Sequence, residues 1–318
     1  MGKADTKTKE FWRNNEHFAD LFNTVLFGGQ QVLRAEELQE KDSDLSASVP
    51  ARSRNDYVKM LAKASDVVKK QSFGVEFSIF TLQNQSRIDY SMPVRELADS
   101  ALIYLGECRA ISERNRARRE GIPFDELFSI GRDDRIHAVI SLTVYYGEKP
   151  WDGPRSLRGM MADMPAALEK IVPDYPLNLV EVRSSDQYAF SNPDVATLFA
   201  LIRSIYRKDL NAKVLRRVSA DMAMTVGEIV KSEKIVTLAR KSRKGGEINM
   251  CQALEEMMQD SKEDGIKEGV SKGKLEAYKD LVRKKLAKGK TAEQIAEELE
   301  EQADKIFEII AMLQGETA

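Results

Sequence analysis

Apolar residues in the first part of the chain recur with the period of a helix. They recur at helical spacing between residues 9 and 33, so they share one face of an α-helix. These positions are Phe11, Phe18, Leu21, Phe22, Val25 and Leu26. Gly28 and Gly29 follow, and glycine favours the end of a helix. We therefore expect one opening helix, followed by a loop over the polar residues 36–55.

Three short stretches further on have the composition of β-strands. They span residues 73–82, 136–146 and 177–182 and are rich in β-branched and aromatic residues. The second is nearly all apolar, as expected for a central strand covered on both faces. One helical pattern begins at Pro93, which suits the first turn of a helix, and another spans residues 194–206. Strands interleaved with helices predict an α/β or mixed α+β core.

Strand signals end at about residue 214, and the remaining chain has a charged, helical pattern. Gly265, Gly269 and Gly273 weaken one of its helices, whereas Thr291 and Gln294 match a capping box that begins another. An apolar stripe follows at Ile295, Leu299, Ile306, Ile309, Ile310 and Leu313. We predict a core domain in residues 1–214 and a charged helical region in residues 215–318.

Charge and cysteine content exclude few classes of protein. The 318 residues include 49 Lys+Arg and 51 Asp+Glu, for a formal net charge of -2. This balance neither requires nor excludes nucleic acid, because an acidic face can offset a basic one. Cys108 and Cys251 are too far apart in sequence for a paired-cysteine zinc site. No apolar run approaches the roughly 20 residues that span a bilayer, so we expect a soluble cytoplasmic protein.

Two basic clusters offer phosphate contacts that would weaken as salt rises. The first comprises Arg109, Arg114, Arg116, Arg118 and Arg119, and the second Arg240, Lys241, Arg243 and Lys244. Glutamates interrupt the first cluster, and most such runs are solvated surfaces. The glutamate-rich helix that begins near residue 292 would be repelled by DNA phosphate, so we expect the C-terminal helices to self-associate through their apolar stripe.

An ordered series of motifs gives the chain a resemblance to a known family. The motifs are NEHFADLFN at residues 15–23, DVVK at 66–69, NQ at 84–85, IDY at 88–90, MPVR at 92–95, YYGEKPW at 145–151 and PRSL at 154–157. In this order they resemble the PD-(D/E)XK nuclease-family transposases, also called recombination-promoting nucleases or YhgA-like putative transposases. The resemblance extends over nearly the whole chain, and the order of the motifs carries it.

The resemblance implies a restriction-endonuclease-like core in residues 1–214 and Mg²⁺-dependent hydrolysis of double-stranded DNA in recombination. Mg²⁺, or Mn²⁺ in its place, prefers oxygen ligands, stabilises developing charge and lowers the pKa of an attacking water. In the family, an Asp at the start of one strand and a Glu on the next hold the metal, and a Gln follows two positions later. Asp66, Gln83 and Gln85 take these positions here, and residues two apart on a strand share a face.

Gln83 departs from the family pattern, because an amide brings no net charge and cannot act as a base. One alternative is a weakened or inactive site whose fold serves binding. A second is replacement of the missing carboxylate by Glu16, Glu76 or Asp89. Glu16 is the best placed, since helix carboxylates complete the metal shell in some nucleases of this fold, whereas Glu76 would need a bulge to reach the same face. A third is a different register of the motif.

The same residues also have ordinary structural roles. Asp66 alone is typical of a helix cap or a surface acid, and Gln83 and Gln85 of polar strand positions. Arg95 is expected to form an ion pair with Glu96 or Asp99 rather than to bind phosphate.

The two histidines do not form a metal site. His17 and His137 are isolated in the sequence, and His137 lies in the apolar stretch, where burial is the default.

Two functions follow from these patterns. One is a metal-dependent endonuclease whose site comprises Asp66, Gln83, Gln85 and Glu16, with Asp66 and Gln83 on the metal. The other is a catalytically degenerate protein that uses the same fold to bind DNA or protein and its helical tail to oligomerise.

Overall fold

The computed structural model describes residues 3–41, 67–71, 75–82, 88–118, 130–209, 211–242 and 246–315. The chain divides by compactness into a first unit, Met1–Leu254, and a second unit, Glu255–Ala318. The domain boundary predicted after residue 214 is a different division and stays a prediction.

A five-stranded mixed sheet forms the centre of the first unit, in the order β1-β2-β3-β4-β5. Its strands are β1 (Leu38–Lys41), β2 (Val67–Gln71), β3 (Glu76–Leu82), β4 (Val139–Tyr145) and β5 (Leu179–Glu181). The first three strands pair antiparallel, whereas β3, β4 and β5 pair in parallel. Parallel neighbours need a crossover connection, and the helix α4 (Met92–Arg118) lies in the connection from β3 to β4.

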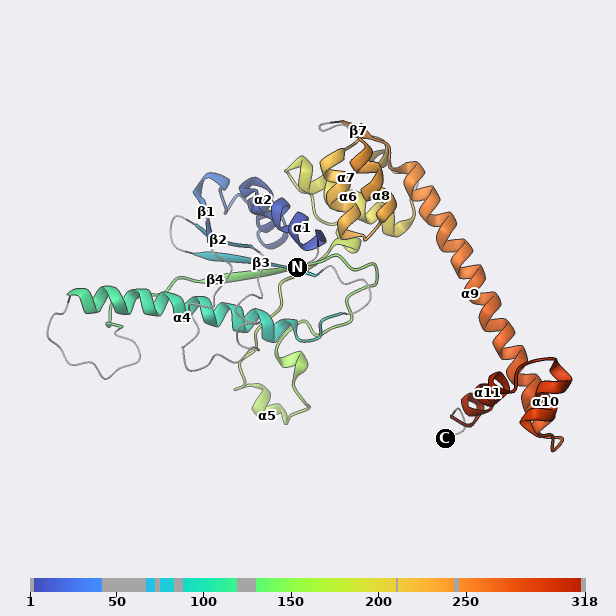
Figure 1. The fold of residues 1–318 in the computed structure, drawn as a ribbon. Coiled ribbons are helices and arrows are strands. Elements are labelled where there is room, and N and C mark those ends of the chain that lie inside the picture. Colours follow the sequence, from blue (N-terminus) through green and yellow to red (C-terminus); the bar gives the residue numbers. More distant parts are fainter. Residues whose placement is uncertain are drawn as a thin grey trace. The chain divides into compact units, whose positions relative to one another are not determined.

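Helices cover both faces of this sheet, as Figure 1 shows. On one face lie α1 (Lys3–Arg13) and α2 (Asn15–Leu26). There Phe22 of α2 meets Phe77 of β3 edge to face, with ring centroids 5.2 Å apart. Trp12 of α1 donates a 2.9 Å hydrogen bond to the hydroxyl of Tyr146. Because side chains alternate along a strand, the neighbouring residues of β3 and β4 point to the opposite face, which α4 covers.

Helix α4 and strand β4 run in opposite directions and contact each other at matched intervals. Going down the helix, Met92 packs with Tyr145, Glu96 accepts a hydrogen bond from Thr143, and Ser100 lies 3.4 Å from the hydroxyl of Ser141. The hydroxyl of Tyr104 then accepts from the backbone of Val139, and Glu107 accepts from His137. Four helical residues advance about 6 Å and two strand residues about 6.6 Å, so every fourth residue of the helix meets every second residue of the strand.

The remainder of the first unit is mainly helical. It contains α5 (Ala166–Glu169), α6 (Pro193–Arg207), α7 (Ala220–Ile229) and α8 (Glu233–Lys241). Short polar side chains cap three of these helices, as expected for residues whose oxygen can accept from the first free backbone N–H groups. The caps are Asn192 for α6, Ser219 for α7 and Ser232 for α8.

The second unit is a small helical cluster. The helix α9 (Cys251–Leu286) begins just before it, and α10 (Ala292–Leu299) and α11 (Ala303–Gly315) follow. Its core contains Val282, Ile295, Ile306 and Ile309, which confirms much of the predicted apolar stripe. The predicted capping box at Thr291 and Gln294 is present.

The structure confirms the mixed α/β class and corrects several expectations. The opening helix is two helices, because Asn14 caps a second one at Glu16 and His17. The predicted loop over residues 36–55 contains the edge strand β1, and its residues from 42 onward lie outside the described part. Strands also occur after residue 214, as the two-residue pair β6 (Val218–Ser219) and β7 (Glu247–Ile248).

Two side chains differ from what their patterns predicted. His137 is not buried in a strand: it precedes β4, and 42% of its side chain is exposed. Arg95 pairs with Asp89 at 2.5 Å, in place of the expected Glu96 or Asp99.

Phe77 offers a test of the sheet's packing against α2. Its side chain is 2% exposed, so Phe77→Ala should lower the free energy of unfolding by about 3–5 kcal/mol. The control Phe307→Ala, on a side chain 49% exposed, should lower it far less. Guanidinium unfolding followed by circular dichroism measures both, and equal losses would contradict the packing.

Candidate functional site

Strand ends from four elements meet at one end of the sheet, which we name the C-terminal end. Val67 at the start of β2 lies opposite Ile79, the middle residue of β3, and the second half of β3 continues toward this end. Leu82 at the end of β3 lies beside Tyr145 at the end of β4, and Tyr145 lies beside Glu181 of β5. Clefts outside the carboxyl ends of parallel strands are common ligand sites, so this end is the candidate functional site.

A compact apolar cluster holds together the segments that gather here. Met92, Tyr145, Trp151 and Leu177 are buried in it, and Ile88 packs against them. The rings of Tyr145 and Trp151 meet edge to face, with centroids 5.3 Å apart at 77°. All of these residues except Leu177 come from the motifs at 88–90, 92–95 and 145–151, so segments distant in sequence converge at the C-terminal end.

Asp89 joins the loop before α4 to the first turn of that helix. It accepts bonds from the backbone and side chain of Ser91 and pairs with Arg95. Burial acts to raise the pKa of Asp89, but the bonds from Ser91 and Arg95 outweigh it and lower that pKa. The carboxylate is therefore ionised and already engaged by donors.

Two further acids at the C-terminal end also have partners. Asp152 accepts a 3.0 Å hydrogen bond from the hydroxyl of Tyr90. Glu181 accepts from the backbone of Trp151 at 2.9 Å and from the guanidinium of Arg155. Burial, with Glu181 and then Asp152 nearby, raises the pKa of the Tyr145 hydroxyl, so that hydroxyl stays protonated at neutral pH.

A buried carboxyl lies behind this end, one helical turn from Met92. Glu96 is fully buried, and this burial is the largest cause that raises its pKa to about 8. The hydrogen bond from Thr143 lowers the pKa of Glu96, and the nearby charge of Asp99 raises it. At pH 7 the carboxyl is therefore mostly neutral. Sequence reasoning considered Glu96 only as a partner for Arg95. The signal that it missed is the four-residue spacing from Met92 through Glu96 to Ser100, which puts polar groups on the sheet side of α4.

The predicted site residues are only partly within the described chain. Asp66, Gln83 and Gln85 lie outside it. Glu16 is described as an exposed residue in the first turn of α2, where its backbone N–H donates to Asn14. Within the described ranges, no group of three or more His, Cys, Asp or Glu side chains could hold a metal ion.

Glu76, one of the acids suggested as a replacement, lies too far from the proposed site. Glu76 begins β3 at the opposite end of the sheet, where Lys41 binds it at 2.6 Å. It therefore does not complete a site near Gln83. Asp89 is at the correct end, although its donors already engage it.

Residues 125–229 match the family model described as Putative transposase, YhgA-like. This match confirms the resemblance to the YhgA-like family. The YhgA-like segment includes β4, β5, α6 and α7, so it supplies one side of the C-terminal end but not residues 66–85. Neither the curated proteins nor the solved structures include a match to the chain. In the part of the chain that the structure describes, no helix is long and apolar enough to cross a membrane.

Glu96 makes stability depend on pH in a defined direction. Its folded pKa of about 8 lies above the ordinary value, so the folded state keeps a proton that the unfolded state loses, and stability falls as pH rises from about 4.5 to about 8. The neutral variant Glu96→Gln should lack this loss. Its advantage over the wild type should grow by at most about 1.4 kcal/mol per pH unit and level off above pH 8.

Guanidinium unfolding at pH 5, 6, 7 and 8 measures this difference. The control Glu113→Gln alters an exposed carboxylate on the same helix and should follow the wild type at every pH. A constant difference between Glu96→Gln and wild type would contradict a raised pKa in the folded protein.

Proposed function

We propose that the chain is a nuclease-type DNA-processing protein whose site lies at the C-terminal end of the sheet. The match to YhgA-like transposases supports a transposase- or nuclease-type function at the level of the family. The proposal goes further, to Mg²⁺-dependent hydrolysis of a phosphodiester bond in double-stranded DNA.

The observation that carries this proposal is the arrangement of β2 and β3. Their antiparallel register directs the start of β2 and the end of β3 toward the same end of the sheet, with Val67 opposite Ile79, three residues before Leu82. In the sequence, Asp66 comes immediately before Val67 and Gln83 immediately after Leu82. The two predicted ligands are therefore neighbours in sequence of strand ends that point the same way. The resemblance requires this arrangement of its Asp and Glu positions.

The proposed ligands offer oxygen atoms, which a hard cation prefers, but together they carry little negative charge. Asp66 supplies one carboxylate, Gln83 an amide oxygen, and Glu16 is the candidate for a second carboxylate. A Mg²⁺ ion bound there would stabilise developing phosphate charge and favour an attacking hydroxide. Gln85 would position that water through its amide, since an amide both donates and accepts hydrogen bonds.

The described residues at this end would orient the DNA rather than cleave it. Arg155 is 59% exposed, and its guanidinium can contact a phosphate while Glu181 positions it. Such contacts release counterions from DNA, so binding should weaken steeply with salt. We further propose that the protein works in the cytoplasm and that its C-terminal helices associate with those of a second copy.

The second candidate function is binding by a catalytically degenerate nuclease fold. It is favoured by the neutral side chain at Gln83 and by the partners that Asp89, Asp152 and Glu181 already have. Loss of a group that only hydrogen-bonds to a metal's ligands typically costs about 10–100-fold in metal affinity or activity. Loss of a directly bound carboxylate should cost at least as much, so we expect weak cleavage from the wild-type chain.

Plasmid cleavage distinguishes the two functions. Purified protein is incubated with supercoiled plasmid and Mg²⁺ or Mn²⁺, and nicked and linear products are quantified. Asp66→Ala should abolish cleavage, whereas Gln83→Glu should raise it by about 10-fold or more, because it restores a charged ligand. Asp304→Ala, an exposed acid in the first turn of α11, is the matched control and should cleave as the wild type does.

The degenerate function predicts the opposite pattern. Wild-type protein would bind duplex DNA without cleaving it, and Gln83→Glu would add no activity. Equal cleavage by Asp66→Ala and wild type would contradict the proposed site.

A further inference from the structure

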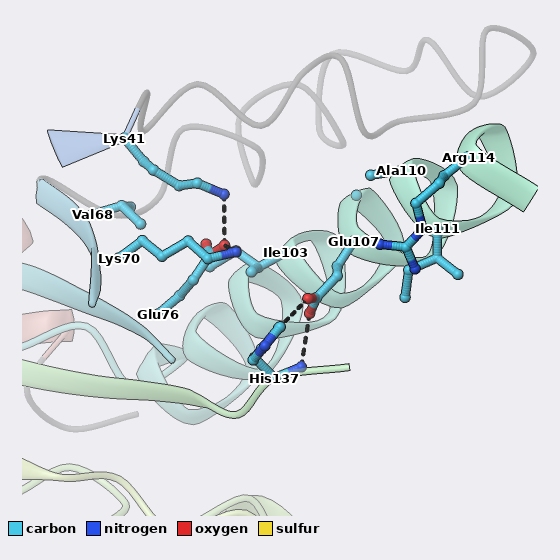
Figure 2. A pocket seen from close by; sticks show the side chains of 11 residues that line it. Lys41, Val68, Lys70, Glu76, Ile103, Glu107, Ala110, Ile111, Arg114 and His137 are labelled. Carbon is cyan, nitrogen blue, oxygen red and sulfur yellow. Dashed lines mark hydrogen bonds and ion pairs between the residues drawn. The ribbon is translucent and has the colours of Figure 1, made fainter. Parts of the chain in front are cut away.

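A pocket lies at the other end of the sheet from the proposed nuclease site (Figure 2). It has a volume of about 500 Å³, within the range of small-molecule sites, roughly 300–1,000 Å³. Its walls come from the ends of β1 and β2, the start of β3, the residue His137 before β4, and the second half of α4. None of the residues that build the C-terminal end lines it.

Two lysines share one buried carboxylate in this pocket. Glu76 is 5% exposed, and the ammonium groups of Lys41 and Lys70 lie 2.6 Å and 3.7 Å from its Oε1 atom. Figure 2 shows the two lysines approaching Glu76 from neighbouring strands. Each ammonium carries several N–H donors, so one carboxylate oxygen cannot satisfy both. Among the described residues, the arrangement therefore fixes two cations side by side, with more N–H donors than Glu76 can accept from.

A second carboxylate in the pocket holds a histidine. Glu107 accepts from the backbone N–H of His137 at 2.9 Å and contacts its Nδ1 atom. Burial acts to raise the pKa of Glu107, but the bonds from His137 and the nearby charge of Lys70 lower it. Because Glu107 engages Nδ1, the Nε2 atom is the ring position left to meet a ligand.

The rest of the lining adds one more cation and an apolar floor. Arg114 is 54% exposed and forms a 3.3 Å ion pair with Asp134 outside the lining. Val68, Ile103 and Ile111 are buried beneath the charged groups. An apolar floor excludes water and strengthens charge interactions above it. With His137 counted as neutral, the lining has three cations, Lys41, Lys70 and Arg114, against two carboxylates.

We propose that this pocket binds a phosphate group carried by a ligand of about the size of a nucleotide. A phosphate offers several oxygen acceptors, which match the remaining donors of Lys41, Lys70 and Arg114. A metal cation is disfavoured, because both carboxylates already bind cationic or N–H groups. A purely apolar ligand would leave the charged rim without partners. The phosphate comes either from a free nucleotide or from a nucleic-acid strand, and the experiment distinguishes these sources.

Isothermal titration calorimetry at low ionic strength tests the proposal on the full-length protein. The probes are inorganic phosphate, adenosine monophosphate and a short DNA duplex. Wild type should bind at least one of them, and the double variant Lys41→Gln with Arg114→Gln should bind it at least about 10-fold more weakly, because two charge-assisted hydrogen bonds are lost. Both side chains are substantially exposed, and Lys70 still pairs with Glu76, so the fold should persist. Arg114→Gln alone provides a milder variant.

The second unit offers a matched control. Lys285 and Lys290 also share one carboxylate, that of Glu298, so Lys285→Gln with Lys290→Gln removes the same charge without altering the pocket. This control should bind the probes as the wild type does, which separates the pocket from a general loss of positive charge.

The three probes identify the source of the phosphate. Binding of adenosine monophosphate and phosphate without the duplex identifies a small-molecule site, whereas a pocket-dependent loss of duplex binding identifies a strand. The proposal is overturned if wild type binds none of the probes, or if the pocket variants and the lysine control lose affinity equally.

Discussion

The contact between α4 and β4 is the constraint on which the first unit depends. Their opposed directions and matched spacing carry the contact from Met92 and Tyr145 at one end to Glu107 and His137 at the other. Because β3 and β4 are parallel, the helix must cross from the end of one strand to the beginning of the next. The start of α4 therefore belongs to the C-terminal end, and its second half belongs to the phosphate pocket. β4 has seven residues, so the two sites are separated by roughly 20 Å of strand.

The unit buries charged groups in three ways, and each has a different consequence. Glu96 takes a proton, because isolated charge is costly in an apolar environment. Glu76 stays paired with two lysines, so it orients cations. Lys69 donates to the backbone oxygen of Arg13 at 2.6 Å and to Asn15, which ties the sheet to the junction of α1 and α2. Burial is the main cause that lowers the pKa of Lys69. Removing one partner from any of these buried interactions would leave a polar or charged group without a partner in the interior.

Periodicity predicted the elements with strong apolar patterns, missed an edge strand without one, and did not show how α4 contacts the sheet. The strands β3 and β4 and the helix α6 were predicted well, because their apolar residues follow the strand or helix period. The strand β1 reads Leu-Gln-Glu-Lys, and an exposed edge strand needs no apolar alternation. The sheet side of α4 carries Glu96 and Ser100 in place of an apolar stripe, so its contact with β4 depends on tertiary partners that single-sequence patterns do not contain.

The candidate site was predictable to a similar degree. The motifs that carry the family resemblance include the segments around Asp89, Tyr145 and Trp151, and the structure brings these segments into one cluster. The pairing of Asp89 with Arg95 was not anticipated, because Glu96 and Asp99 are closer to Arg95 in sequence. The pocket at the other end was not anticipated either, since its residues come from β1, β2, β3 and α4 and share no local pattern.

The hydrogen bonds and ion pairs that these acids already make affect which of them could replace a missing carboxylate. If Asp89 moved to a metal, it would give up its bonds to Ser91 and Arg95, and with them the support of the first turn of α4. Loss of a comparable helix cap costs about 1 kcal/mol, before the ion pair is counted. Glu181 would similarly release Arg155 and the backbone of Trp151. Glu16 is exposed, and within the described ranges its side chain has no such bonds to give up, so among these acids its move to a metal would cost the fold least.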